Sequence, residues 1–130
     1  MEQVELTMLK PCSPQEAYRR VDFDARVAGA GPAELVHLCY EHLVSALGTA
    51  VHADLNGDNC LKSRSMTRAL TAITALQMGV AGADGMAVAL GQLYEGARRT
   101  ILDNALAFDA DAITALRTDF AEIGQALRAG

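Results

Sequence analysis

Apolar residues recur at steps of three and four through nearly the whole chain, and this spacing limits its fold more than any other feature. Steps of three or four place side chains on one face of an α-helix, whereas almost nothing in the body of the chain alternates at a period of two. The pattern therefore predicts helices with one apolar face each. One such apolar stripe consists of Met66, Ala69, Ile73, Leu76 and Val80.

Capping and turn residues divide this pattern into helices. The run Ser13-Pro14-Gln15-Glu16 has the form of a capping box with proline at the first helical position, so a short helix is expected to begin there. Further helices are expected over residues 32–53 and 62–80, separated by an Asn-Gly turn. Asp84 is expected to cap a helix that ends near residue 108, and a last helix should follow a cap at residues 109–111. Its stripe would end at Leu127.

Four long amphipathic helices joined by short loops favour an antiparallel bundle. We therefore expect an all-α protein, an antiparallel four-helix bundle with a short extra N-terminal helix, over residues 13–130. A chain of 130 residues can bury such a core as one domain without disulfides or a structural metal. In residues 1–12, Val4, Leu6 and Met8 alternate at a period of two without a helix-start signal, which predicts a flexible N-terminal arm.

Charge and composition exclude several classes of protein. The formal net charge of −5 argues against binding to nucleic acid or to an anionic membrane, because both require a basic face. No stretch approaches the roughly 18 uncharged residues of a membrane span, and the acidic first residues do not form a signal peptide. Cys12, Cys39 and Cys60 are widely spaced without a zinc motif. They favour a reduced, cytoplasmic protein.

The stretch GPAELVHLCYEHL, residues 31–43, gathers polar side chains in the manner of a metal or catalytic site. On a helix, however, Cys39 and His42 turn toward the core, whereas His37 and Glu41 fall together on the opposite side, as a solvated pair. One metal ion cannot then bind both His37 and Cys39, and apolar surroundings make a cysteine a poor nucleophile. The Glu-x-x-His motif of di-iron bundles is also absent. We expect no metal, no cofactor and no catalytic residue.

A histidine phosphotransfer bundle is an alternative interpretation, because such domains expose one histidine on a four-helix bundle. His37 and His52 are its candidates, but neither is followed by the leucine, lysine and glycine spacing of those modules. Phosphate uptake from an acyl-phosphate donor that survives both His37→Gln and His52→Gln would eliminate this alternative.

Two of the three tyrosines precede an acidic residue, in Tyr40-Glu41 and Tyr94-Glu95, on two different predicted helices. Each tyrosine falls at the edge of its apolar stripe, where a ring can pack while its hydroxyl reaches water. The pattern predicts either boundary residues of the core or walls of a surface groove.

Several short fragments follow one another in a particular order along the chain. They are Tyr18, Pro32-Ala33-Glu34-Leu35, Leu38-Cys39-Tyr40-Glu41, Arg68-Ala69 with Ile73 and Leu76, Gly85, Ala89-Leu90, Leu93-Tyr94-Glu95 and, after two arginines, Ile101. In this order and spacing the chain resembles the flagellin-specific secretion chaperone family FliS from residue 17 to about residue 127. It departs from the family in Leu102-Asp103-Asn104-Ala105, where Glu-Ala-Asn is common, and in lacking the usual C-terminal tryptophan. A diverged paralogue with another client is the alternative.

The resemblance implies a non-enzymatic bundle that binds the disordered C-terminal segment of flagellin in the cytoplasm. It would prevent premature polymerisation and deliver flagellin for export, with components of the flagellar export gate as further partners. The arm of residues 1–12 would cover the client groove when the client is absent, simple disorder being the alternative. A homodimer is left open. The residues expected to bind the client in surface hydrophobic grooves are Tyr18, Leu35, Tyr40, Leu43, Leu93, Tyr94 and Ile101.

Overall fold

The computed structural model describes residues 13–80 and 82–129, which form five α-helices and no strand. This confirms the all-α class. The expected boundaries lie within a few residues of the observed ones. The residues of the predicted N-terminal arm lie outside the described part, so the arm stays a prediction. The helices are α2 (Pro14–Ala28), α3 (Pro32–Leu55), α4 (Asn59–Gly79), α5 (Gly85–Leu106) and α6 (Ala110–Ala129).

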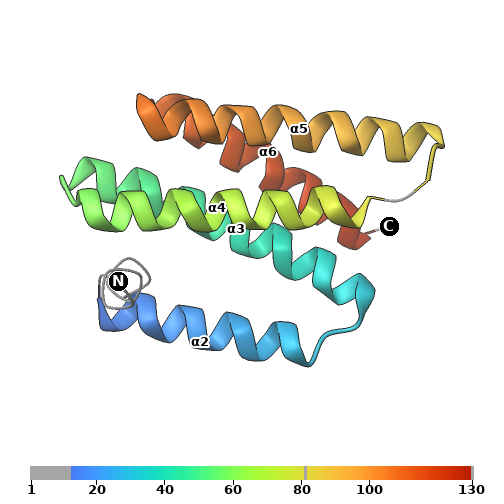
Figure 1. Ribbon diagram of the computed structural model, residues 1–130, viewed down its shortest axis with the longest axis horizontal. Helices are drawn as coiled ribbons and strands as arrows, with labels where there is room; N and C mark the ends of the chain where they lie inside the picture. Colours follow the sequence, from blue (N-terminus) through green and yellow to red (C-terminus); the bar gives the residue numbers. More distant parts are fainter. Residues whose placement is uncertain (1–12, 81, 130) are drawn as a thin grey trace, which may run out of the picture.

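Successive helices run in opposite directions along the molecule (Figure 1). Helix α3 is the central element, because it contacts α2, α4 and α6, whereas α5 packs against α4 and α6. Helix α2 lies at one edge of the molecule and contacts α3 (Figure 1). Because three helices cover α3, it buries a wider arc of side chains than a helix with one apolar face.

Side-chain caps begin the helices where the sequence predicted them. Ser13 accepts a hydrogen bond of 3.1 Å from the backbone N–H of Glu16, and Asp84 accepts one of 2.7 Å from the N–H of Ala87. Gly57, in the predicted Asn-Gly turn, has a positive φ of 68°, which a residue with a side chain rarely adopts. Each cap satisfies a backbone donor that the helix leaves without a partner, a contribution of about 0.5–2 kcal/mol.

Four residues of the stripe predicted for α4, Met66, Ala69, Ile73 and Leu76, are buried, and Val80, just beyond the helix, is half-buried. The stripe predicted for α5 is confirmed only in its second half. The apolar spacing in this helix predicts one buried stripe of Met86, Leu90, Leu93, Ala97 and Ile101. Met86 is exposed, and the neighbouring Ala87 is buried instead. The core face of α5 continues through Tyr94, Ala97 and Ile101. Ala97 and Ile101 of the predicted stripe are therefore confirmed, whereas Tyr94 takes the buried position expected for Leu93, because its hydroxyl finds a partner in the core. The largest side chains with almost no exposure are Leu38, Leu43, Leu47, Ile73, Ile101, Ile113 and Phe120.

The expectation that the cysteines are all reduced is wrong for Cys60, which is disulfide-bonded. Cys39 is a free, half-buried thiol, and burial raises its pKa, as its predicted orientation toward the core implies. Disulfides are uncommon in cytosolic proteins, so the cysteines do not support a cytoplasmic location.

Candidate functional site

Tyr40 of α3 and Tyr94 of α5 meet inside the core. Their hydroxyl oxygens lie 2.8 Å apart, within hydrogen-bonding distance, and each residue is only 3% exposed. Burial raises the pKa of both phenols. The expectation that these hydroxyls reach water is therefore wrong. The physical reason is that each hydroxyl forms with the other the hydrogen bond that it would otherwise form with water.

A third ring, Phe120 of α6, joins the tyrosine pair. Its centroid lies 5.7 Å from that of Tyr40 and 6.3 Å from that of Tyr94. Helix α6 also approaches α3 closely, because a Cβ on Gly124 would lie 3.3 Å from Cδ2 of Tyr40. The three rings thus connect α3, α5 and α6 at one level of the core.

Above this ring cluster, the surface between α3 and α6 is hollowed. A cavity of about 430 Å³ lies there, lined by the apolar side chains of Tyr40, Val44 and Phe120 and by the small residues Ala121 and Gly124. The small residues on α6 leave the space that a larger side chain would fill. We call this cavity the apolar half of the α3 groove.

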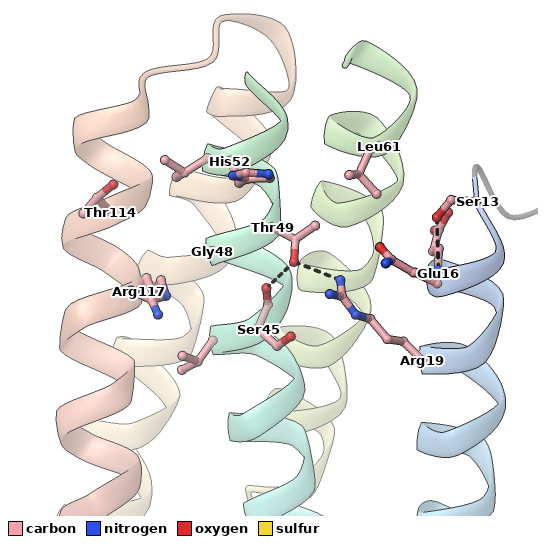
Figure 2. A pocket seen from close by; sticks show the side chains of 13 residues that line it. Ser13, Glu16, Arg19, Ser45, Gly48, Thr49, His52, Leu61, Thr114 and Arg117 are labelled. Atoms are coloured by element: carbon pink, nitrogen blue, oxygen red, sulfur yellow. Dashed lines mark hydrogen bonds between the residues drawn. The ribbon is translucent and has the colours of Figure 1, made fainter. Parts of the chain in front are cut away.

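A second cavity of about 670 Å³ follows along α3 and reaches from α2 to α6 (Figure 2). Val44 and Ser45 line both cavities, so the two lie next to each other along α3, and we call them together the α3 groove. This second part, the polar half of the α3 groove, carries charged and hydroxyl groups among apolar ones. Its lining includes Arg19, Thr49, His52, Leu61, Thr114 and Arg117.

Two arginines reach toward α3 across the polar half, Arg19 from α2 and Arg117 from α6 (Figure 2). Arg19 donates a hydrogen bond of 3.4 Å to the hydroxyl of Thr49. Arg117 lies across Gly48, where a Cβ would come within 2.9 Å of its Nε. Gly48 thus provides the room in which the Arg117 side chain lies against α3.

One stacked ring pair and one ion pair hold α2 against α3. Phe23 stacks on His42 with 3.8 Å between ring centroids. The pKa of His42 is lowered to about 4, mainly by burial and to a smaller extent by the positive charge of the nearby Arg68. Glu41 pairs with Arg26 of α2 at 2.9 Å and with Arg128 of α6 at 3.6 Å. The expected pair of Glu41 with His37 is therefore wrong, because arginines on two other helices reach this carboxylate.

Glu16 ties the start of α2 to α4. Its carboxylate is 3% exposed and lies 3.5 Å from Arg68 and 3.7 Å from Arg64. A buried carboxylate requires such cationic partners, since desolvation otherwise costs several kcal/mol. The capping box thus supplies a tertiary contact in addition to the cap at Ser13.

The residues expected to bind a client occupy three environments. Tyr40 lines the apolar half of the groove, and Tyr18 is 75% exposed on α2. Leu35 and Leu93 are half-buried. Leu43, Tyr94 and Ile101 are buried in the core. Their roles in client binding stay predictions. The prediction missed the groove residues Val44, Ala121, Gly124, Arg19 and Arg117. The only signal of this groove in the sequence is small residues, such as Ala121 and Gly124, inside a long helix.

Among the residues that the structure describes, no group of three or more His, Cys, Asp or Glu side chains is arranged to hold a metal ion. None of the helices of residues 13–80 and 82–129 combines the length and apolar character needed to cross a membrane.

A long groove on an all-helical framework is typical of proteins that bind a helical segment of a partner. Residues 14–128 match the family model of the flagellar protein FliS. The match spans most of the chain, so the protein belongs to the FliS family, as its sequence fragments indicated. FliS is a chaperone family with a flagellar role and is not known for enzymatic activity. No curated protein matches the chain.

Proposed function

We propose that this protein is a cytoplasmic export chaperone that binds the disordered C-terminal segment of flagellin. It would prevent premature polymerisation and aid secretion. Membership of the FliS family supports the chaperone role. The α3 groove, two adjacent cavities along one helix, is the observation that supports binding of an extended helical client. In this proposal α3, α4, α5 and α6 are the antiparallel four-helix bundle, with α2 as the extra N-terminal helix.

The dimensions of the α3 groove suit a helical segment. Its lining on α3 runs from His37 to His52, about 22 Å at 1.5 Å per residue, the length of a helix of about 15 residues. Ordering a disordered segment costs roughly 2–5 kcal/mol. Burial of one large aliphatic side chain contributes about 1.5–3 kcal/mol, so two or three in the apolar half offset that cost.

The seven predicted client residues take different parts in this proposal. Tyr40 contacts the client directly, because it lines the apolar half. Leu43, Tyr94 and Ile101 are buried in the core, and Tyr94 would support the groove through its ring contacts with Tyr40 and Phe120. Tyr18, Leu35 and Leu93 would contact client residues beyond the groove, as a client longer than one helix requires.

The N-terminal arm is the proposed cover of the empty groove. Ser13, where residues 1–12 join α2, lines the polar half. A segment attached there begins beside the groove. Surfaces outside the α3 groove remain for components of the flagellar export gate or for a second copy of the chain.

Titration of a C-terminal flagellin peptide into the full-length protein tests the proposal by calorimetry and circular dichroism. We expect stoichiometric binding, a gain of helix and a negative heat-capacity change, since apolar surface is buried while the client folds. Val44→Glu places a charge in the middle of the groove and is expected to weaken binding at least tenfold. Val88→Glu is the matched control, because Val88 is 51% exposed on α5 and is not among the residues that line the groove.

Absence of binding at high micromolar peptide would overturn the flagellin proposal and favour another client. Equal loss of affinity in the two valine variants would instead contradict the placement of the client in the α3 groove. Both variants require unchanged helix content and unfolding midpoint for this comparison.

A further inference from the structure

We infer that the polar half of the α3 groove binds a carboxylate of the client, so that the bound helix is acidic on the side that faces Arg19 and Arg117. This inference rests on the proposed function and specifies the chemistry of the client. The polar half of the groove carries two arginines, whereas the whole chain has a formal net charge of −5.

The acidic residues of the groove are already paired, whereas two of its cations have no acidic partner within the part of the chain that the structure describes. Glu41 lies between Arg26 and Arg128, and Glu16 lies beside Arg64 and Arg68. All four of these arginines offset carboxylates within the fold. The polar half then retains the charge of Arg19 and Arg117 on a chain whose formal net charge is −5.

Arg117 is the more informative of the two remaining arginines. Among residues 13–80 and 82–129 it makes no ion pair, and its side chain lies against the backbone of α3 at Gly48. Arg117 is exposed, but this position beside Gly48 already places its guanidinium at the groove before a ligand arrives. A donor group that is positioned in advance loses less conformational freedom on binding.

Arg19 approaches from the opposite side and is oriented by a neutral partner. Its guanidinium donates to the Thr49 hydroxyl, and Thr49 in turn donates to the carbonyl oxygen of Ser45 at 3.0 Å. Because the Thr49 hydroxyl is neutral, this hydrogen bond does not offset the positive charge of Arg19. A carboxylate between Arg19 and Arg117 would accept charge-assisted hydrogen bonds, which are stronger than those between neutral groups.

The neighbouring apolar half makes a free anion an unsuitable occupant. Val44 lies in both halves, and Tyr40, Phe120 and Ala121 make the other half mainly apolar. The charged residues in its lining, Glu41 and Arg128, pair with each other. A ligand that fills the groove must therefore carry apolar side chains and a carboxylate on one face. An amphipathic helix with acidic residues meets that requirement.

Three synthetic helical peptides of about 16 residues provide the test, together with the C-terminal flagellin peptide. The synthetic peptides share one apolar face and carry two Glu, two Gln or two Lys residues at the positions that face the polar half. Binding to the full-length protein is measured by fluorescence anisotropy at low and high salt. We expect the Glu peptide to bind about tenfold more tightly than the Lys peptide, with a difference that shrinks in high salt.

Variants of Arg117 connect that preference to the groove. Arg117→Gln is expected to weaken binding of the Glu peptide about threefold or more, and Arg117→Glu about tenfold or more, while binding of the Lys peptide improves. Arg99→Glu makes the same change of charge on an exposed residue of α5 and is expected to leave the preference intact. Equal affinity of the Glu and Lys peptides for the wild-type protein, or a preference that survives Arg117→Glu, would overturn the inference.

The flagellin peptide separates the inference from the proposed function. If it binds the wild-type protein and Arg117→Glu equally well, the carboxylate site is wrong and the flagellin proposal stands. If it does not bind, but the Glu peptide binds and depends on Arg117, the flagellin proposal is wrong and the carboxylate site stands. Failure of all four peptides overturns both.

Discussion

The hydroxyls of Tyr40 and Tyr94 form a hydrogen bond in the core between α3 and α5. The two hydroxyls are each other's hydrogen-bond partner. Tyr94→Phe therefore leaves the buried Tyr40 hydroxyl without a partner, which should lower the free energy of unfolding by about 1–3 kcal/mol. Removal of both hydroxyls leaves no unpaired group. We therefore expect the double variant, Tyr40→Phe with Tyr94→Phe, to be destabilised by less than the sum of the single variants in urea unfolding. Additive single effects would contradict this coupling.

His42 should make stability depend on pH. Its pKa is lowered to about 4 in the fold, below the ordinary value of about 6.5, so the unfolded chain binds more protons between these values. The free energy of unfolding should therefore fall as pH decreases from about 6.5 to about 4, by on the order of 1–3 kcal/mol. Urea unfolding across this range measures the change.

His42→Phe is the control for this pH dependence, because it retains a ring to stack on Phe23 and cannot titrate. In the variant, the part of the dependence of the free energy of unfolding on pH that is due to His42 should disappear. The titration of Glu41, whose pKa the hydrogen bond from Arg26 lowers, remains in both proteins. An unchanged slope in His42→Phe would show that the histidine is not responsible.

Gly124→Ala should destabilise the protein although alanine favours a helix. The new Cβ would lie 3.3 Å from the ring of Tyr40, which cannot move freely because Phe120 and Tyr94 hold it. We expect a loss of about 0.5–2 kcal/mol in thermal or urea unfolding. Gly96→Ala on α5 is the matched control. Its Cβ meets nothing within 4 Å, so this variant should gain about 0.5–1 kcal/mol.

Glu16→Gln should loosen α2 more than the remaining helices. The change leaves Arg64 and Arg68 beside a neutral amide in a buried position, which we expect to cost about 1–3 kcal/mol. Hydrogen exchange should rise in residues 14–28 before it rises in α4. Glu122→Gln, at an exposed position of α6, is the control, and equal exchange in the two variants would contradict an anchoring role for Glu16.

Deletion of residues 1–12 should strengthen binding of the flagellin peptide if the arm covers the groove. The expected gain is threefold or more, since a competing segment attached beside Ser13 would be removed. Calorimetry on the full-length and shortened proteins measures it. Unchanged or weaker affinity would count against an autoinhibitory arm.

The helices of this protein follow from its sequence because their signals are local. The stripe of α4 repeats at helical spacing, and Ser13 and Asp84 cap the residues that follow them directly. Such signals need no knowledge of other segments. The class of the fold was therefore predictable, together with most helix boundaries.

The groove was not predictable, because its determinants are contacts between helices. Burial of Tyr94 depends on a hydroxyl of α3, and the partners of Glu41 come from α2 and α6. Gly48 and Gly124 are unfavourable residues inside a helix when considered locally. Their role is apparent only where Arg117 and Tyr40 come close to them. The family fragments identified the protein class without locating this surface.

If a client helix binds along the α3 groove as proposed, the order of the two halves along α3 constrains its direction. Tyr40 lies in the apolar half, and Gly48, in the polar half, follows two turns later on α3, about 12 Å along the axis. A helix that contacts both halves needs its apolar and acidic residues at that separation and in that order. The same sequence bound in the opposite direction would place its acid over the rings and its apolar residues over the arginines. A groove that binds its client in this way would distinguish the N-terminal from the C-terminal end of the bound segment.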